Sequence, residues 1–178
     1  MSKEIEKIIK EGCCSHCGSC VSLDISGESR MIDTKYGPIP KFSSRSEFPS
    51  YINDSCPSIG INYPDLYKYH YKNLPRNWLL GSIKNVRTGF SSNSKIRKKG
   101  ASGGVITQTL IYLLENKLID GAILAKQGVP TPEKARAFIA RTVDEIIDCS
   151  QSIYIPVSML DILKDLNPNE KYAITCLP

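Results

Sequence analysis

The chain has 178 residues, of which 41% are hydrophobic and 23% are charged, and its formal net charge is +5. This composition predicts a globular protein with one buried core and a small appendage. The charged opening segment lacks the apolar stretch of a signal peptide, and no later run approaches the length of a membrane span, so we expect a cytoplasmic protein in a reducing compartment.

The sequence predicts little regular structure over residues 2–80. An apolar stripe of isoleucines predicts a helix over residues 2–11 that ends at Gly12. Residues 21–25 and 30–34 flank a turn and predict a small hairpin, whereas the glycine and prolines of residues 36–40 oppose regular structure. Residues 57–80 mix tyrosines, prolines and cations and predict an irregular packed connector. No fold signature supports nucleic-acid binding there.

The second part of the chain alternates strands and helices. We expect strands at 83–90, 121–126, 137–141 and 172–176, and helices from Ser102 to about Lys117, at 144–149 and at 159–165. Such alternation predicts the α/β class, with α+β as a variant, and a mixed sheet with flanking helices. A core strand at the end of the chain predicts an amino-terminal fragment of a longer protein.

Four cysteines form one pattern. Cys14, Cys17 and Cys20 follow one another at intervals of three, and the distant Cys56 stands directly before a proline. Three thiolates at this spacing on a tight loop can each reach a different iron of a cubane cluster, and a remote cysteine can bind the fourth iron. The small residues between them leave backbone N–H groups free to point at the sulfurs. The spacing therefore predicts a 4Fe–4S cluster on these four cysteines.

Zinc and disulfides are the competing uses of cysteine. Structural zinc usually takes its cysteines as two separated pairs, whereas here three stand together and one stands alone. An odd total of seven cysteines without a secretory signal disfavours a disulfide framework. Cys13 could replace Cys14 as a ligand, although a bystander role fits the spacing better. A zinc-stabilised binding domain stays open as an alternative.

Positive charge is concentrated in one window. Between Asp65 and Glu115 the sequence has no acidic residue and nine Lys or Arg residues, which leaves the rest of the chain at about −4. Such a window attracts anions. A solvated basic face is the simpler alternative.

A glycine-rich turn stands near the end of this window. Lys98 and Lys99 precede it, and Ser102, Gly103 and Gly104 lead into apolar residues at helical spacing, with Ser102 as a plausible N-cap. Glycines at a helix start let backbone N–H groups approach a phosphate, and the helix dipole adds attraction. These five residues are therefore candidate contacts to an anionic cofactor, with tight helix packing as the alternative. The turn matches neither the Walker loop nor the dinucleotide-binding glycine pattern.

These segments together resemble the coenzyme F420 hydrogenase/dehydrogenase beta-subunit family. The resemblance runs over nearly the full length, and the segments that carry it are Cys14-Ser15-His16-Cys17-Gly18-Ser19-Cys20, Cys56-Pro57, residues 99–107, 112–115 and 118–122, Ser152-x-Tyr154-x-Pro156 and Leu177-Pro178. Two positions depart from the family pattern, because Ile153 stands where lysine is frequent and Cys176 where glycine is usual.

The resemblance implies an iron–sulfur flavoprotein oxidoreductase subunit. It would transfer electrons between a 4Fe–4S cluster, FAD and coenzyme F420 or a similar small-molecule acceptor, in contact with a redox partner subunit or ferredoxin. The expected organisation is a cluster-binding segment over residues 1–60, a connector over 61–82 and an α/β flavin-binding domain over 83–178. We identify no catalytic acid or base, since His16 lies in the cysteine loop and His70 in the connector. A non-catalytic, ferredoxin-like electron-transfer module is the alternative.

Overall fold

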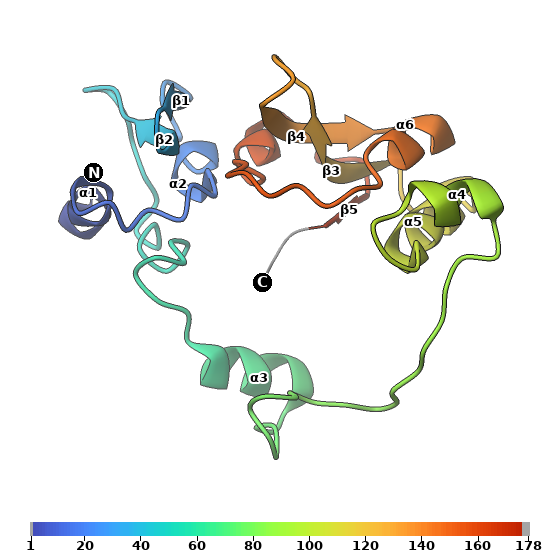
Figure 1. Cartoon of the computed structure of the whole chain (residues 1–178). Helices are drawn as coiled ribbons and strands as arrows, with labels where there is room; N and C mark the ends of the chain where they lie inside the picture. Colours follow the sequence, from blue (N-terminus) through green and yellow to red (C-terminus); the bar gives the residue numbers. More distant parts are fainter. Residues whose placement is uncertain (1, 176–178) are drawn as a thin grey trace.

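The computed structural model describes residues 2–175, and these form an amino-terminal unit, an extended arm and a sheet unit (Figure 1). The amino-terminal unit contains α1 (Lys3–Lys10), α2 (Ser19–Ser22) and the antiparallel ribbon β1 (Arg30–Thr34) and β2 (Gly37–Lys41). The arm carries α3 (Tyr63–Tyr71). The sheet unit contains α4 (Ser94–Lys99), α5 (Val105–Glu115), β3 (Gly121–Gln127), β4 (Ala135–Ala140), α6 (Val143–Asp148), the 3-10 helix η1 (Asp161–Asp165) and β5 (Tyr172–Ile174).

The predicted mixed α/β architecture is confirmed in the sheet unit. Strand β3 lies in the centre, antiparallel to β4 on one side and parallel to β5 on the other. Helices α5 and α6 share a hydrophobic core with one face of the sheet, which contributes Ala122, Leu124 and Ala140. Ile123 is also buried and points to the opposite face, since neighbouring side chains of a strand alternate.

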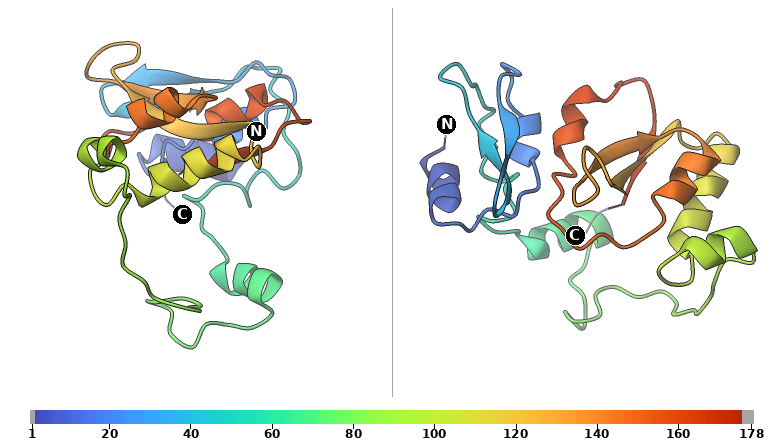
Figure 2. Two further views of the ribbon diagram at one scale, coloured as in Figure 1. Left: turned by 90° about the vertical axis from the view of Figure 1, so that its right-hand side faces the viewer. Right: turned by 45° about the horizontal axis from the view of Figure 1, so that its top comes forward.

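The two units lie side by side, and η1 forms part of the contact between them (Figure 2). Helix η1 packs against α2 and against β4, so it bridges the amino-terminal unit and the edge of the sheet. The predicted helix over 159–165 is therefore present as this short 3-10 helix. Within the described residues, no helix has the length and apolar character needed to cross a bilayer.

The predicted hairpin of residues 21–25 with 30–34 is wrong, because the ribbon lies one segment further along. Strand β1 pairs with residues 37–41, and residues 19–22 form a helical turn instead. Pro38 and Pro40 sit two apart in β2, so both missing N–H groups fall on the same edge of the strand. A two-stranded ribbon tolerates this, since its outer edges have no partner to lose.

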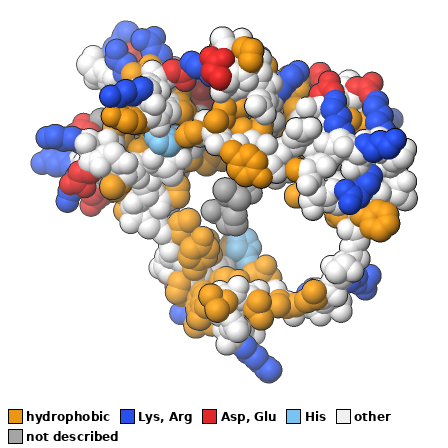
Figure 3. Space-filling view, viewed as in Figure 1, with side chains coloured by type: hydrophobic (Ala, Val, Ile, Leu, Met, Phe, Trp, Pro, Cys, Tyr) orange, Lys and Arg blue, Asp and Glu red, His pale blue; other side chains and the backbone are white. Residues whose placement is uncertain are grey.

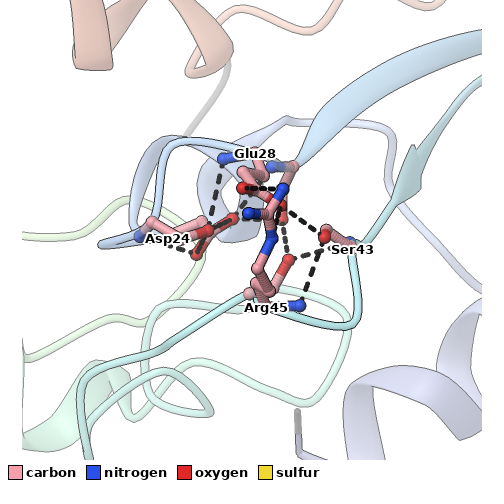
Figure 4. Close-up of polar contacts among 7 residues, drawn as sticks. Asp24, Glu28, Ser43 and Arg45 are labelled. Atoms are coloured by element: carbon pink, nitrogen blue, oxygen red, sulfur yellow. Dashed lines mark hydrogen bonds and ion pairs between the residues drawn. The ribbon is translucent and has the colours of Figure 1, made fainter.

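The Asp24 carboxylate links residues 24–29 and Glu47 of the amino-terminal unit through hydrogen bonds. It accepts hydrogen bonds from the N–H groups of Ser26, Ser29 and Glu47 and from the hydroxyls of Ser26 and Ser29. Next to it, Glu28 accepts from Ser43 and pairs with Arg45 (Figure 4). These contacts close a turn at residues 24–29, which is why no strand precedes β1.

The arm contains helix α3, where the sequence predicted an irregular connector. Asn62 caps its start and Lys72, in a left-handed conformation, ends it. The side chain of Tyr67 stacks against Tyr71 and Trp78. No residue of α3 is buried. Hydrophobic side chains gather on the surface of the arm (Figure 3).

Two further predictions around the glycine turn are wrong. Residues 83–90 form no strand, because they run over the exterior, all exposed, with no neighbouring strand to pair with. Helix α5 begins at Val105 with the left-handed Gly104 as N-cap, so Ser102 is not the cap. The sequence analysis also missed α4, whose single buried side chain is Ile96.

Candidate functional site

The four predicted ligand cysteines line one small, largely enclosed cavity. Cys14 and Cys17 reach it from the loop between α1 and α2, Cys20 reaches it from α2, and Cys56 reaches it from a turn 36 residues after Cys20. The other walls come from the isoleucine stripe of α1, from the ribbon and from the cysteine loop itself; they are Ile5, Ile8, Ile9, Met31, Pro40, Ser15, Gly18, Ser19 and Ser58. Helix α1 therefore acts as an apolar wall behind the sulfurs.

Hydrogen bonds hold the cysteine loop on several sides. The Ser15 N–H donates to Ser58 Oγ at 2.9 Å, which ties the loop to the turn that carries Cys56. His16 has a left-handed backbone, with φ of 61°, and its Nδ1 donates to the Pro38 carbonyl at 2.6 Å. The His16 N–H donates to Cys14 Sγ at 3.4 Å. His16 is thus a structural part of the loop.

The surroundings of the cysteines favour the neutral thiol in the absence of a cation. Burial raises the pKa of Cys14 and raises that of Cys20 to about 12, and the other thiols of the group add to both effects. Like charges this close together cannot all be present without a counter-charge. Binding of a metal group at these sulfurs would therefore release protons and favour the thiolates.

The donor set fits a four-thiolate metal group. The six cysteines that the structure describes are all free thiols, and four of them face the same cavity. Within residues 2–175, no three His, Cys, Asp or Glu side chains stand at the spacing of a preformed metal site. The fit therefore rests on the chemistry and common location of the donors, and these four thiols would hold the group.

The glycine turn lines a second cavity of about 430 Å³, within the usual range of small-molecule sites. Ser102, Gly103 and Gly104 all line it, together with the first turn of α5. A Cβ at Gly103 would stand 3.0 Å from the Gly89 carbonyl, and one at Gly104 would stand 2.9 Å from the Ile96 side chain. Glycine is therefore needed at both positions for packing.

The start of α5 is open toward this cavity. No side chain caps the helix, so the first N–H groups are not satisfied from within it. In the glycine turn, the Ser102 carbonyl accepts a hydrogen bond from Arg97 Nη1 at 2.6 Å. The helix dipole and these N–H groups make the location suitable for an anion.

Lys98 and Lys99 lie at the end of α4, outside the lining of the cavity. Lys99 Nζ pairs with Asp148 at 2.5 Å and holds α4 against α6. The pKa of the Asp148 carboxyl is lowered first by its hydrogen bond from Lys99 and then by the positive charge. The structure thus gives Lys99 a packing role between two helices.

Sequence reasoning missed the far wall of this cavity. Cys149, Ser150, Gln151 and Ser152 line it from the segment after α6, and Thr175 lines it from the end of β5. Only Ser152 carried a sequence signal, through its place in a family segment. The others have no motif, because their proximity to the glycine turn arises from the sheet topology.

The largest cleft, of about 910 Å³, lies between the amino-terminal unit and the sheet unit. The ribbon, strand β4 and η1 line it. Asp33 on the ribbon pairs with Lys134 beside β4 across it. Pro38 and Ser158 belong both to its lining and to the contacts of His16, so the cleft adjoins the cysteine loop.

Comparison with known proteins identifies relatives of part of the chain. Residues 86–164 match the family described as coenzyme F420 hydrogenase/dehydrogenase, beta subunit N-term. The coenzyme F420 hydrogenase subunit beta of Methanosarcina barkeri is 30% identical over 86 residues, which are 48% of this chain and 29% of that protein. The F420-dependent formate dehydrogenase 1 subunit beta of Methanococcus maripaludis is 26% identical over 88 residues, 49% of this chain and 23% of that protein.

A solved structure gives a similar extent of overlap. A chain of the F420-reducing [NiFe] hydrogenase complex from Methanosarcina barkeri is 27% identical, with a TM-score of 0.41, over 47% of this chain and 31% of that one. This chain thus spans less than a third of the relatives that it matches. The matched family segment contains the glycine turn and lies outside the four cysteines of the first cavity. Residues 86–164 are therefore similar to the amino-terminal segment of coenzyme F420 hydrogenase/dehydrogenase beta subunits.

Proposed function

We propose that the chain is the cluster- and flavin-binding part of an oxidoreductase subunit that transfers electrons between a 4Fe–4S cluster, FAD and coenzyme F420 or a similar acceptor. The observation that carries this proposal is the convergence of four free cysteines, from two distant segments, on one cavity. The family match of residues 86–164 supports the oxidoreductase class, because the similar proteins are named as beta subunits of F420-linked enzymes. The residues of the cavity would hold the cluster as four thiolate ligands.

The glycine turn supports the flavin part of the proposal. Its open helix start and the 430 Å³ cavity suit a phosphate group and part of the adjoining cofactor. Ser102, Gly103 and Gly104 would supply the contacts, while Lys98 would contribute charge from outside the lining. When bound, a flavin exchanges electron pairs and a cluster exchanges single electrons, so together they connect two kinds of carrier.

The cleft beside the cysteine loop is our proposed site for the small-molecule acceptor. It is open to solvent, large enough for a cofactor-sized ligand, and shares Pro38 and Ser158 with the contacts of the loop. Filling it with Ala137→Trp should abolish reduction of F420 while the cluster and flavin absorption bands stay unchanged. Retained F420 reduction in this variant would place the acceptor elsewhere.

The arm supports the proposed partner subunit or ferredoxin. Leu79 is 95% exposed and Val86 is 82% exposed, in a stretch without acidic residues. Apolar side chains among cations suit an apolar protein surface with acidic residues around it.

Anaerobic purification followed by iron, acid-labile sulfide and flavin analysis tests the function directly. We expect about four irons per chain, a cluster absorption spectrum and bound flavin. Cys56→Ser should abolish the cluster, whereas the matched Cys149→Ser, outside the cysteine cavity, should keep it. Cluster without any flavin binding would favour the ferredoxin-like module, and a colourless zinc protein would refute both readings.

A further inference from the structure

We propose that residues 156–161 form a strap that sets the reduction potential of the bound cluster, with Ser158 as its positioning residue. This inference rests on the proposed cluster at the four cysteines. It adds a role for a segment about 140 residues away from the cysteine loop, which no motif in the sequence signals.

The strap hydrogen-bonds to two successive carbonyls of the cysteine loop. Ser158 Oγ donates to the His16 carbonyl at 2.9 Å, and the Leu160 N–H donates to the Cys17 carbonyl at 2.8 Å. The strap also comes close to Gly18, where an added Cβ would stand 2.7 Å from the Asp161 nitrogen. Gly18 has φ of 85°, so both its backbone conformation and this close approach require glycine.

These contacts determine where the N–H groups of the loop point. In a planar trans peptide the C=O and the N–H point in opposite directions. When the carbonyls of His16 and Cys17 are directed at the strap, the N–H groups of Cys17 and Gly18 are directed away from it. Cys17 and Gly18 line the cysteine cavity, so the cavity is the side that these N–H groups face.

Both N–H groups are available for the sulfurs. Within residues 2–175, neither the Cys17 nor the Gly18 N–H donates to another protein atom. The His16 N–H already donates to Cys14 Sγ. Donation to cluster sulfur stabilises the reduced cluster, which carries the additional negative charge, and therefore raises the reduction potential. The strap thus holds the N–H groups of Cys17 and Gly18 in an orientation that raises the reduction potential of the cluster.

The central experiment is a redox titration of the anaerobically purified, cluster-loaded chain, monitored by the electron paramagnetic resonance signal of the reduced cluster. Ser158→Ala removes the hydroxyl that holds the His16 carbonyl, and we expect a more negative reduction potential with unchanged iron and sulfide content. Ser158→Thr keeps a hydroxyl and should restore the potential. Thr109→Ala is the matched control, because Thr109 Oγ1 also donates to a backbone carbonyl, that of Val105 at 2.9 Å, and neither residue belongs to the strap or to the cysteine cavity.

A second variant keeps the test decisive if Ser158→Ala loses the cluster. Gly18→Ala displaces the strap from the other side through the contact with Asp161 and should also lower the potential. Resonance Raman spectra in D₂O supply an independent readout, since exchange at N–H groups bound to sulfur shifts the Fe–S bands. We expect smaller isotope shifts in Ser158→Ala and Gly18→Ala than in the unmodified chain and in Thr109→Ala.

The outcomes separate the strap from the proposed function. Potentials and isotope shifts equal to those of Thr109→Ala, in cluster-loaded Ser158→Ala or Gly18→Ala protein, would overturn the role of the strap while the cluster stands. Iron-free, sulfide-free unmodified protein would overturn the proposed function itself. A lowered potential in both strap variants, restored by Ser158→Thr, would establish the inference.

Discussion

Replacing Gly104 by alanine tests whether the glycine turn is fixed by packing as well as by backbone conformation. Gly104 has φ of 73°, and an added Cβ would stand 2.9 Å from the Cγ2 atom of Ile96, which is 1% exposed. A left-handed alanine costs about 1–2 kcal/mol. Forcing a methyl group against a buried side chain adds about 1–3 kcal/mol. We therefore expect Gly104→Ala to lower the free energy of unfolding by about 2–5 kcal/mol.

Gly128→Ala is the matched control for this prediction. Gly128 lies in the same sheet unit with φ of 77°, and nothing stands within 4 Å of an added Cβ. Gly128→Ala should therefore lower the free energy of unfolding only by the cost of the left-handed backbone, about 1–2 kcal/mol. Urea unfolding monitored by circular dichroism measures both variants, and unchanged m-values support the comparison. Equal losses in the two variants would refute the packing argument, and with it the reason for glycine at the start of α5.

Three further predictions concern other parts of the chain. Burial by itself would raise the pKa of Asp24, but hydrogen bonds from Ser29 and its neighbours outweigh it and hold that pKa well below the ordinary value. The Asp24 carboxylate therefore stabilises the fold above about pH 4, and this stabilisation is lost as the pH falls below that value. We expect Asp24→Asn to be less stable than the unmodified chain at pH 7 and to lose less stability on acidification. Unfolding measured over a series of acidic pH values would show both effects. Thr142→Ala removes the capping box that Thr142 forms with Glu145 at the start of α6 and should cost about 1 kcal/mol in thermal or urea unfolding; no loss would contradict the capping role. Burial also raises the pKa of Cys149, so mass spectrometry should show slower alkylation of this thiol in the folded chain than in urea, and equal rates would contradict its burial.

Local sequence pattern was sufficient for several elements. The isoleucine stripe and Gly12 predicted α1, and the short apolar runs predicted β3 and β4 to within two residues. The spacing of the cysteines and the glycine turn identified both candidate cavities. These features can be predicted from the sequence because each depends on residues that are close in the chain. Hydrophobic periodicity and turn-forming residues determine local structure at that range.

The failures arose where a distant contact outweighed local preference. Residues 83–90 have strand-like composition, yet a strand needs a partner, and the sheet offers none at that position. Val21 lies in a helical turn and is 1% exposed, because Asp24 closes the following loop through contacts as far away as Glu47. Neither outcome could be predicted from the segment alone.

The sequence by itself determined the chemistry of this protein: which thiols, which glycines and which cations are present, and at what spacing. Only the tertiary structure decided that α1 and the ribbon enclose the four cysteines, that residues 149–152 complete the glycine-turn cavity, and that Ser158 contacts His16. The physical reason is that spacing constrains only residues within one loop or helix turn. Contacts between segments far apart in the chain depend on how the sheet, α1 and η1 pack, and the free energy of that packing is distributed over the whole core.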